Sequence, residues 1–183
     1  MKQNGYTFHI TTQCDANDIR DVETLAFGFA KEADLVAGLL SDKTAQPTLS
    51  LLARHQGKAI GHILFTRVTF KNEVNSPLMH ILAPLAVVPQ YQRMGVGGLL
   101  MRYGIEQLEA MGSRIVFVLG HAEYYPRYGF EPCAGDKGFH APYPIPDKYK
   151  ACWMMQSLSA EPLSQTGEIM CAQALMRPEH WRE

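Results

Sequence analysis

The first half of the chain carries apolar residues at spacings that alternate between strand and helix. A strand is predicted over residues 6–12, and Asp15 is placed to cap the helix that follows. A second helix is predicted over 32–40, and the turn Gln56-Gly57-Lys58 joins strands at 48–54 and 59–70. The predicted buried face of the first helix consists of Ile19, Val22, Leu25, Ala26 and Phe29.

The second half continues this alternation. An apolar run at 86–88 ends a strand at a proline, and a helix over 95–111 is stopped by Gly112. The remaining predicted elements are a strand at 115–119, a short helix at 123–127 distorted by its proline, and a late strand at 151–158. Strands mixed with helices, and one clear hairpin, indicate an α+β fold with a mixed sheet.

A glycine cluster stands where the strand before Pro89 turns into the next helix. Gly95, Gly97 and Gly98 fall within four residues. The first N–H groups of a helix lack intrahelical partners and carry partial positive charge, so phosphate binds there readily. Because glycine costs roughly 1 kcal/mol against alanine inside a helix, the cluster predicts a phosphate cradle. An ordinary loop-to-helix junction is the alternative.

Two familiar phosphate motifs do not fit this cluster. A P-loop requires lysine followed by serine or threonine after its last glycine, but Leu99 and Leu100 stand there. A dinucleotide fold requires a third glycine in register and an acidic residue about twenty positions later. The later segment 113–118 contains no acidic residue, which makes dinucleotide binding a weak interpretation.

The cradle resembles the acetyl-CoA signature of the GNAT N-acetyltransferase superfamily. Gln92, Gly95 and Gly97 fill its pattern Gln-x-x-Gly-x-Gly. Tyr125 lies five residues before Phe130 of a Gly-Phe pair, as in a later motif of that family. The segment 119–130 is similar to the YhbS-like branch of predicted N-acetyltransferases, and the whole resemblance covers about residues 78–133.

This resemblance implies a GNAT-like acyl-CoA N-acyltransferase fold, with a central, mixed, mostly antiparallel sheet flanked by helices. It implies direct transfer of an acetyl group from acetyl-CoA to an amine of a small molecule, peptide or protein. A non-catalytic acyl-CoA-binding or regulatory domain is the alternative, and an O- or S-acyltransferase is a third. The implied cofactor-binding residues are Leu85, Ala86, Val87, Gln92, Arg93, Met94, Gly95, Val96, Gly97 and Gly98.

Acetyl transfer needs an acid and a base. The departing thiolate benefits from a proton, for which the resemblance implies Tyr125, with Tyr124 as second choice. Ile81 stands where some family members carry a catalytic glutamate, and it cannot take a proton. His121 and Glu123 are therefore the candidate bases, beside a water chain without any single base.

Acidic residues gather in the segment 15–34, which spans the first two predicted helices. Six carboxylates stand there against Arg20 and Lys31. They form either a solvated helix face or a rim that attracts a cationic amine. The loop 135–150, with three prolines and three aromatic residues, is either a wall of the substrate site or a structural excursion.

Length and charge limit the remaining possibilities. The 183 residues suit one domain over 1–160, followed by an extension over 161–183 that adds a strand or a dimer contact. A net charge of −1 argues against a broad nucleic-acid surface. The sequence shows no apolar signal core and no membrane span. Four scattered cysteines without a ligand cluster predict reduced thiols, no metal site and a cytoplasmic location.

Overall fold

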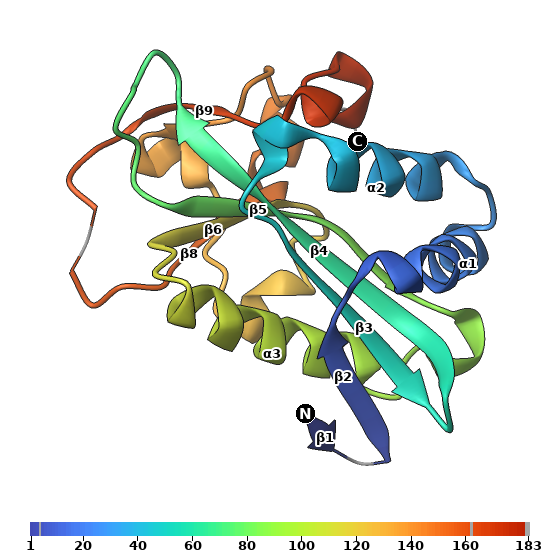
Figure 1. Cartoon of the computed structure of the whole chain (residues 1–183). Coiled ribbons are helices and arrows are strands. Elements are labelled where there is room, and N and C mark those ends of the chain that lie inside the picture. The colour runs from blue at the N-terminus through green and yellow to red at the C-terminus, as the bar shows by residue number, and fades with distance from the viewer. Residues whose placement is uncertain (4, 162, 182–183) are drawn as a thin grey trace.

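The computed structural model describes residues 1–3, 5–161 and 163–181, which are built around a mixed sheet (Figure 1). Its main strands run in the order β1-β2-β3-β4-β5-β6-β8, and every neighbouring pair is antiparallel except β5 with β6. The mostly antiparallel sheet predicted from the sequence is thereby confirmed. The strands are β1 Lys2–Gln3, β2 Tyr6–Ile10, β3 Leu49–His55, β4 Lys58–Phe70, β5 Met79–Val87, β6 Ile115–Leu119 and β8 Trp153–Ser157.

Three α-helices cover the two faces of this sheet. Figure 1 shows α1 (Ala16–Phe27) and α2 (Lys31–Ser41) on one face and α3 (Val96–Ala110) on the other. All three lie close to their predicted ranges. Short 3-10 helices complete the chain at Gln13–Asp15, Lys43–Ala45, Pro89–Tyr91, Tyr125–Tyr128, Ala134–Lys137, Asp147–Cys152, Gln173–Leu175 and Pro178–Trp181.

The predicted buried face of α1 is wrong at two positions. Leu25 is 53% exposed and Phe29 is 54% exposed, whereas Glu23 is fully buried. The helix ends at Phe27 because Gly28 takes a left-handed conformation with φ of 82°, so Phe29 falls outside it. The apolar stripe is therefore narrower than the spacing predicts, and it includes a carboxylate.

Asp15 precedes α1 as predicted, but its carboxylate makes no hydrogen bond to the first turn of that helix. It accepts hydrogen bonds from the backbone N–H of Thr12 and from Arg54, both at 2.9 Å. These bonds hold the pKa of Asp15 well below its usual range, with the Thr12 amide contributing most. Asp15 thus ties the start of α1 to β3, where Arg54 lies.

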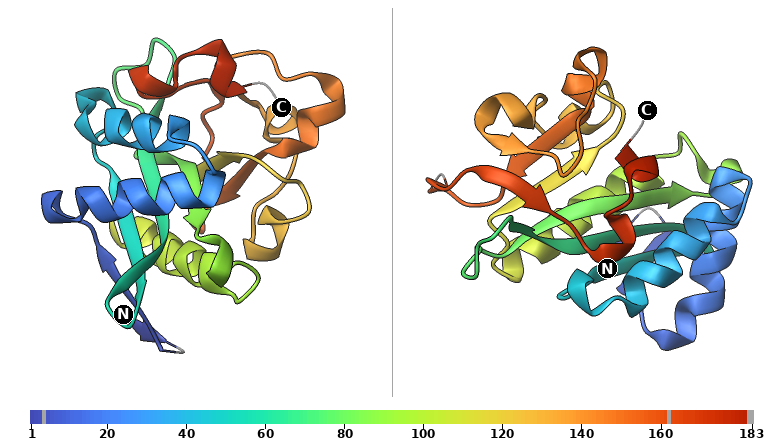
Figure 2. Two further views of the ribbon diagram at one scale, coloured as in Figure 1. Left: turned by 90° about the vertical axis from the view of Figure 1, so that its right-hand side faces the viewer. Right: turned by 90° about the horizontal axis from the view of Figure 1, so that it is seen from above.

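The C-terminal segment packs against the rest of the fold. Strand β9 (Gly167–Met170) pairs with the end of β4 and with β7 (Phe139–His140), and Figure 2 shows this segment running back over the sheet toward α2. Trp181 is buried with its ring centroid 5.6 Å from that of Trp153. Positions 162, 182 and 183 of the predicted extension lie outside the described residues.

Two further expectations from the sequence concern membrane spans and the cysteines. Within the described ranges, no helix combines the length and apolar character needed to cross a membrane. None of the four cysteines, all of which the structure describes, forms a disulfide.

Candidate active site

Strands β5 and β6 part in the middle of the sheet. They pair in parallel only from Met79 to Leu82 on β5, opposite Ile115 to Val118 on β6. Strand β5 then continues to Val87, while its register with β4 shifts between Ile63 and Phe65. Such a bulge bends a strand. The edge of β5 that faces β6 is consequently unpaired by β6 beyond Leu82.

The unpaired part of β5 leads directly into the glycine turn. The side-chain amide of Gln92 donates a hydrogen bond to the carbonyl oxygen of Val87 at 2.9 Å, which closes the turn onto the strand. Gly95 adopts φ of 85°, a left-handed conformation that favours glycine, and α3 begins at the next residue. The first amides of α3 have no carbonyl within the helix to bond, and they carry its positive dipole end.

The other two glycines have reasons that the sequence analysis missed. A β-carbon at Gly97 would lie 2.9 Å from the hydroxyl of Tyr124, and one at Gly98 would lie 2.5 Å from the hydroxyl of Tyr128. A side chain at either position would therefore force a tyrosine ring to shift. The two glycines therefore let tyrosine rings rest on the first turn of α3, in addition to leaving its amides open.

A cleft of about 860 Å³ lies between the end of β5, the start of α3 and the segment after β6. Of the predicted site residues, those lining it are Leu85, Val87, Gln92, Arg93, Gly95, Gly97, Gly98, His121 and Tyr125. Tyr124, the second choice of proton donor, lines it too, and the lining residues that the sequence did not predict are Tyr91, Arg127 and Tyr128. Arg127 and Arg93 are both exposed, so this end of the cleft carries positive charge.

Four predicted residues are not among those lining the cleft. Ala86 and Val96 are buried, at 1% and 0% exposure, and Met94 is 57% exposed. Ala86 is turned away because neighbouring residues of a strand face opposite sides, and Leu85 and Val87 face the cleft. Glu123 is exposed, at the surface of the segment after β6.

Tyrosine rings form one wall of the cleft. The centroid of the Tyr124 ring lies 5.2 Å from that of Tyr125 and 5.1 Å from that of Tyr128. The ring of Tyr125 also packs on Phe130 and on Gly120, where a β-carbon would come within 2.5 Å of it. Burial, and then its hydrogen bond with Tyr128, raise the pKa of Tyr124 well above its usual range. Tyr124 therefore stays protonated at neutral pH.

The histidines divide between the cleft and the core. His121 follows β6 and is exposed at the cleft. His80 is fully buried, with its ring nitrogens 2.9 Å from the Ser113 hydroxyl and 3.1 Å from the carbonyl oxygen of Pro47. Burial lowers the pKa of His80 to about 4. His80 is therefore a core histidine whose two ring nitrogens both have hydrogen-bond partners, and it does not line the cleft.

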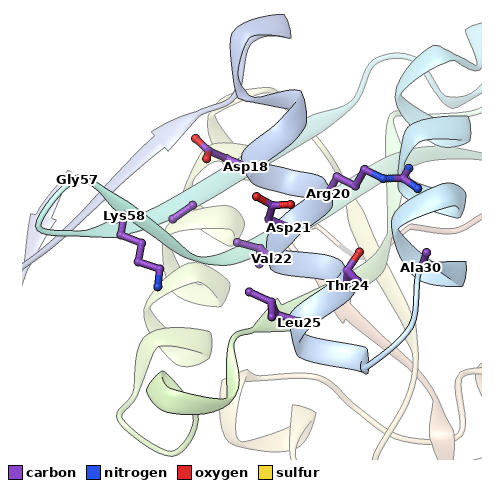
Figure 3. Close-up of a pocket in the computed structure, with 10 residues that line it drawn as sticks. Asp18, Arg20, Asp21, Val22, Thr24, Leu25, Ala30, Gly57 and Lys58 are labelled. Atoms are coloured by element: carbon purple, nitrogen blue, oxygen red, sulfur yellow. The ribbon is translucent and has the colours of Figure 1, made fainter.

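A second pocket, of about 500 Å³, lies between α1 and the β3–β4 hairpin. Figure 3 shows Asp18 and Asp21 on the side of α1 that faces Lys58, while Arg20 points toward α2. Arg54 forms ion pairs with Asp18 and Asp15, and Arg20 forms one with Asp34 at 2.9 Å. Three of the six carboxylates of the predicted acidic rim thus have an arginine partner, two of them sharing Arg54, and a fourth, Glu23, is buried beside His62.

A parallel strand pair that parts beside a helix N-terminus, with phenols facing the opening, defines the class of acyl-CoA-dependent N-acyltransferases. Comparison with known proteins agrees. The sequence model of the Acetyltransferase (GNAT) family matches residues 16–130. The chain is 70% identical over 172 residues to the N-acetyltransferase YjhQ of Escherichia coli (strain K12), covering 94% of this chain and 95% of that protein. This chain therefore belongs to the GNAT acetyltransferase family.

Solved structures show the same fold. The crystal structure of the GNAT N-acetyltransferase YhbS from Escherichia coli, in complex with CoA, superposes with a TM-score of 0.85 at 25% identity, covering 97% of this chain and 95% of that one. A GNAT acetyltransferase from Brucella melitensis, in complex with acetyl-CoA, gives a TM-score of 0.74 at 28% identity, covering 94% and 99%. The predicted family and fold are confirmed.

Proposed function

We propose that this chain moves an acetyl group from acetyl-CoA directly to the amine of a small molecule, peptide or protein. The observation that carries the proposal is the cleft in which the free edge of β5, the first amides of α3 and Tyr125 meet. The pyrophosphate would bind at the N-terminus of α3, helped by Arg93 and Arg127. The pantetheine arm would pair with the backbone of β5, as a further strand would.

The chemistry follows from this placement. The nitrogen lone pair of the neutral amine attacks the thioester carbonyl carbon, and the oxyanion is stabilised by a backbone N–H of residues 85–87. When the carbon–sulfur bond breaks, the electron pair leaves on sulfur. Tyr125 gives its phenolic proton to the thiolate and regains one from the nitrogen, with Tyr124 as the alternative donor. His121 is the candidate base on the cleft side, and Glu123 is the more remote candidate.

A thiol-release assay with acetyl-CoA and a panel of alkylamines, amino acids and peptides tests this function. We expect CoA release that depends on the amine, and calorimetric binding of acetyl-CoA that weakens on replacing Arg93 or Arg127 with alanine. The matched control Arg20→Ala, on the α2-facing side of α1, should bind acetyl-CoA as the native chain does. Acetyl-CoA binding that is undetectable, or unaffected by both cleft arginines, would contradict the assigned cleft. Binding without release to any amine would favour the non-catalytic alternative, which no comparison supports.

A further inference from the structure

A chain of buried polar groups crosses the face of the sheet that α1 covers. The Thr11 hydroxyl donates to the Ser50 oxygen at 2.7 Å, and Ser50 lies 2.9 Å from Nε2 of His62. Nδ1 of His62 lies 2.5 Å from Oε1 of Glu23. If each hydroxyl donates to the next group, Nε2 of His62 accepts and its Nδ1–H donates to Glu23. Every member of the chain then has a partner along one direction.

This chain of hydrogen bonds ends at Glu23, whose second carboxylate oxygen has no partner. Oε2 of Glu23 is buried without a hydrogen-bond partner, in a side chain that is 0% exposed, and so is Oε2 of Glu32 in α2. A buried carboxylate that lacks partners is costly unless it meets a cation or takes a proton. Glu23 thus keeps one open acceptor position in the interior, with the rest of the chain holding its other oxygen in place.

The surroundings favour uptake of a proton by Glu23. Burial raises the pKa of Glu23, the hydrogen bond with His62 partly opposes the rise, and Glu32 adds to it. The facing elements carry few other titratable groups: β5 offers none between Leu82 and Val87, and Asp15 before α1 is bound to Arg54. His180 of the tail lies near Glu32 and carries a lowered pKa, mainly because of burial.

The chain of hydrogen-bonded groups lies one strand away from the residues that line the cleft. His62 on β4 is paired in register with Ala86 on β5, between Leu85 and Val87, which line the cleft. Since side chains alternate along a strand, His62 and Ala86 face α1 while Leu85 and Val87 face the cleft. The residues of β5 at this level, 83–85, are partly exposed. Glu23 therefore lies on the face of the sheet that α1 and α2 cover, opposite the face on which Leu85 and Val87 line the cleft.

We propose that Oε2 of Glu23 accepts the proton that the acceptor ammonium loses before it attacks acetyl-CoA. The inference rests on the acetyl transfer proposed above. The ammonium gives one proton to the Glu23 carboxylate, and the neutral amine forms the carbon–nitrogen bond as the carbon–sulfur bond breaks. The second nitrogen proton reaches the thiolate through Tyr125, and the Glu23 carboxylic acid later returns its proton to water. His62, fixed by Ser50, is a positioning residue for Glu23.

Glu23→Gln is the decisive variant, because it keeps the size and the hydrogen bond to His62 but cannot take the proton. Single-turnover rates are measured with butylamine and with 2,2,2-trifluoroethylamine, which is far less basic and largely neutral at pH 8. We expect the butylamine rate to fall about 100-fold or more, and the trifluoroethylamine rate to stay within about threefold. The control Glu106→Gln, on the exposed side of α3, should change neither rate.

Other outcomes would overturn the inference. Equal losses of the two rates, with butylamine and with trifluoroethylamine, in Glu23→Gln would show a structural role. Equal losses of these two rates in Ser50→Ala, which weakens the hydrogen-bond chain but leaves the Glu23 carboxylate, would show the same. A loss confined to butylamine in His121→Gln, with Glu23→Gln unaffected, would place the base in the cleft instead. These results differ from failure of the proposed function, in which the native chain acetylates no amine at all.

An infrared titration tests, without any acceptor, the premise that Glu23 takes up a proton more readily than an ordinary glutamate. The difference between the native chain and Glu23→Gln isolates the carboxylic C=O band of Glu23. We expect this band to appear at a pH above the ordinary glutamate value of about 4.3. A band that appears only at or below that value would refute Glu23 as proton acceptor.

Discussion

Replacing Gly98 with alanine tests whether tyrosine contact, rather than phosphate access alone, explains the glycines of the cradle. The added methyl group would lie 2.5 Å from the Tyr128 hydroxyl and 3.0 Å from two ring carbons. Ordinary contacts begin near 3.4 Å, so the hydroxyl must move by about 1 Å. The ring is held by Tyr124, with centroids 5.1 Å apart, and by Arg102 over its face at 5.9 Å.

The expected magnitude comes from two opposing effects. Alanine gains up to about 1 kcal/mol over glycine in a helix, while overpacking costs about 1–3 kcal/mol. The net change in the free energy of unfolding is therefore small, because Tyr128 is only half-buried and can shift. The shifted ring takes space from the cleft that it lines. We expect acetyl-CoA affinity to fall about tenfold, equivalent to about 1.4 kcal/mol.

A double-mutant cycle with Tyr128→Phe, read by calorimetry, makes this test specific. Removing the hydroxyl eliminates the 2.5 Å contact, so Gly98→Ala should then cost threefold or less in affinity, a coupling of about 0.7 kcal/mol. Gly38→Ala in α2 is the matched control, because its β-carbon would meet only Ala174 at 3.9 Å. If Gly98→Ala lowered the affinity equally in both backgrounds, steric contact with the Tyr128 hydroxyl would not be the reason for the glycine.

Three further predictions concern catalysis, pH and the tail. Tyr125→Phe should lower the single-turnover rate about 100-fold with acetyl-CoA affinity nearly intact; a loss in Tyr124→Phe instead would identify the other phenol as donor. The pKa of His80, about 4 when folded against 6.5 when unfolded, means that only the unfolded chain binds this proton between those values. Stability should therefore fall by about 3 kcal/mol as pH drops from 6.5 to 4, and urea unfolding of His80→Asn should lack that part of the slope. Trp181→Ala should cost about 3–5 kcal/mol in thermal unfolding, since its ring is buried and its Nε1 donates to the Leu175 carbonyl at 2.8 Å; the exposed Glu179→Ala should cost little, and similar losses would contradict a tail packed into the core.

The elements with strong local signals could be predicted from the sequence. The strand predicted at 115–119 coincides with β6, and the helix predicted at 95–111 differs from α3 by one residue at each end. In both cases the apolar spacing is regular, and the ends of the helix are marked by Gly95 and by Gly112, the latter with φ of 83°. The phosphate cradle could be predicted for a similar reason, because its strand, turn and helix are contiguous in the chain.

Elements made by distant partners could not be predicted in this way. Strand β7 has two residues and β9 has four, and β9 pairs with both β7 and the end of β4 across long stretches of chain. The sequence predicts an added strand within 161–183 only as one of two alternatives, and it predicts no strand at 139–140, because this pairing depends on where the chain returns. The division at residue 160 and the possible homodimer likewise stay predictions. So do the roles of Tyr125, His121 and Glu123, because acid–base function depends on a bound acceptor and cofactor.

The most informative signals were those that interrupt a pattern. Glu23 lies among the apolar positions Ile19, Val22 and Ala26 of one helix face, and His62 lies in the buried segment 60–65 of β4, whose other residues are glycine or apolar. A search for apolar periodicity ignores polar residues on an apolar face. A charged group on a buried face must nevertheless find a partner or carry a function. The charge pattern instead groups Glu23 among the six acids of a solvated helix face or an acceptor-attracting rim, from which its position on the apolar helix face separates it. In the structure a hydrogen bond joins Glu23 to His62 through Oε1 of Glu23. The other carboxylate oxygen, Oε2, is the atom to which we assign the proton.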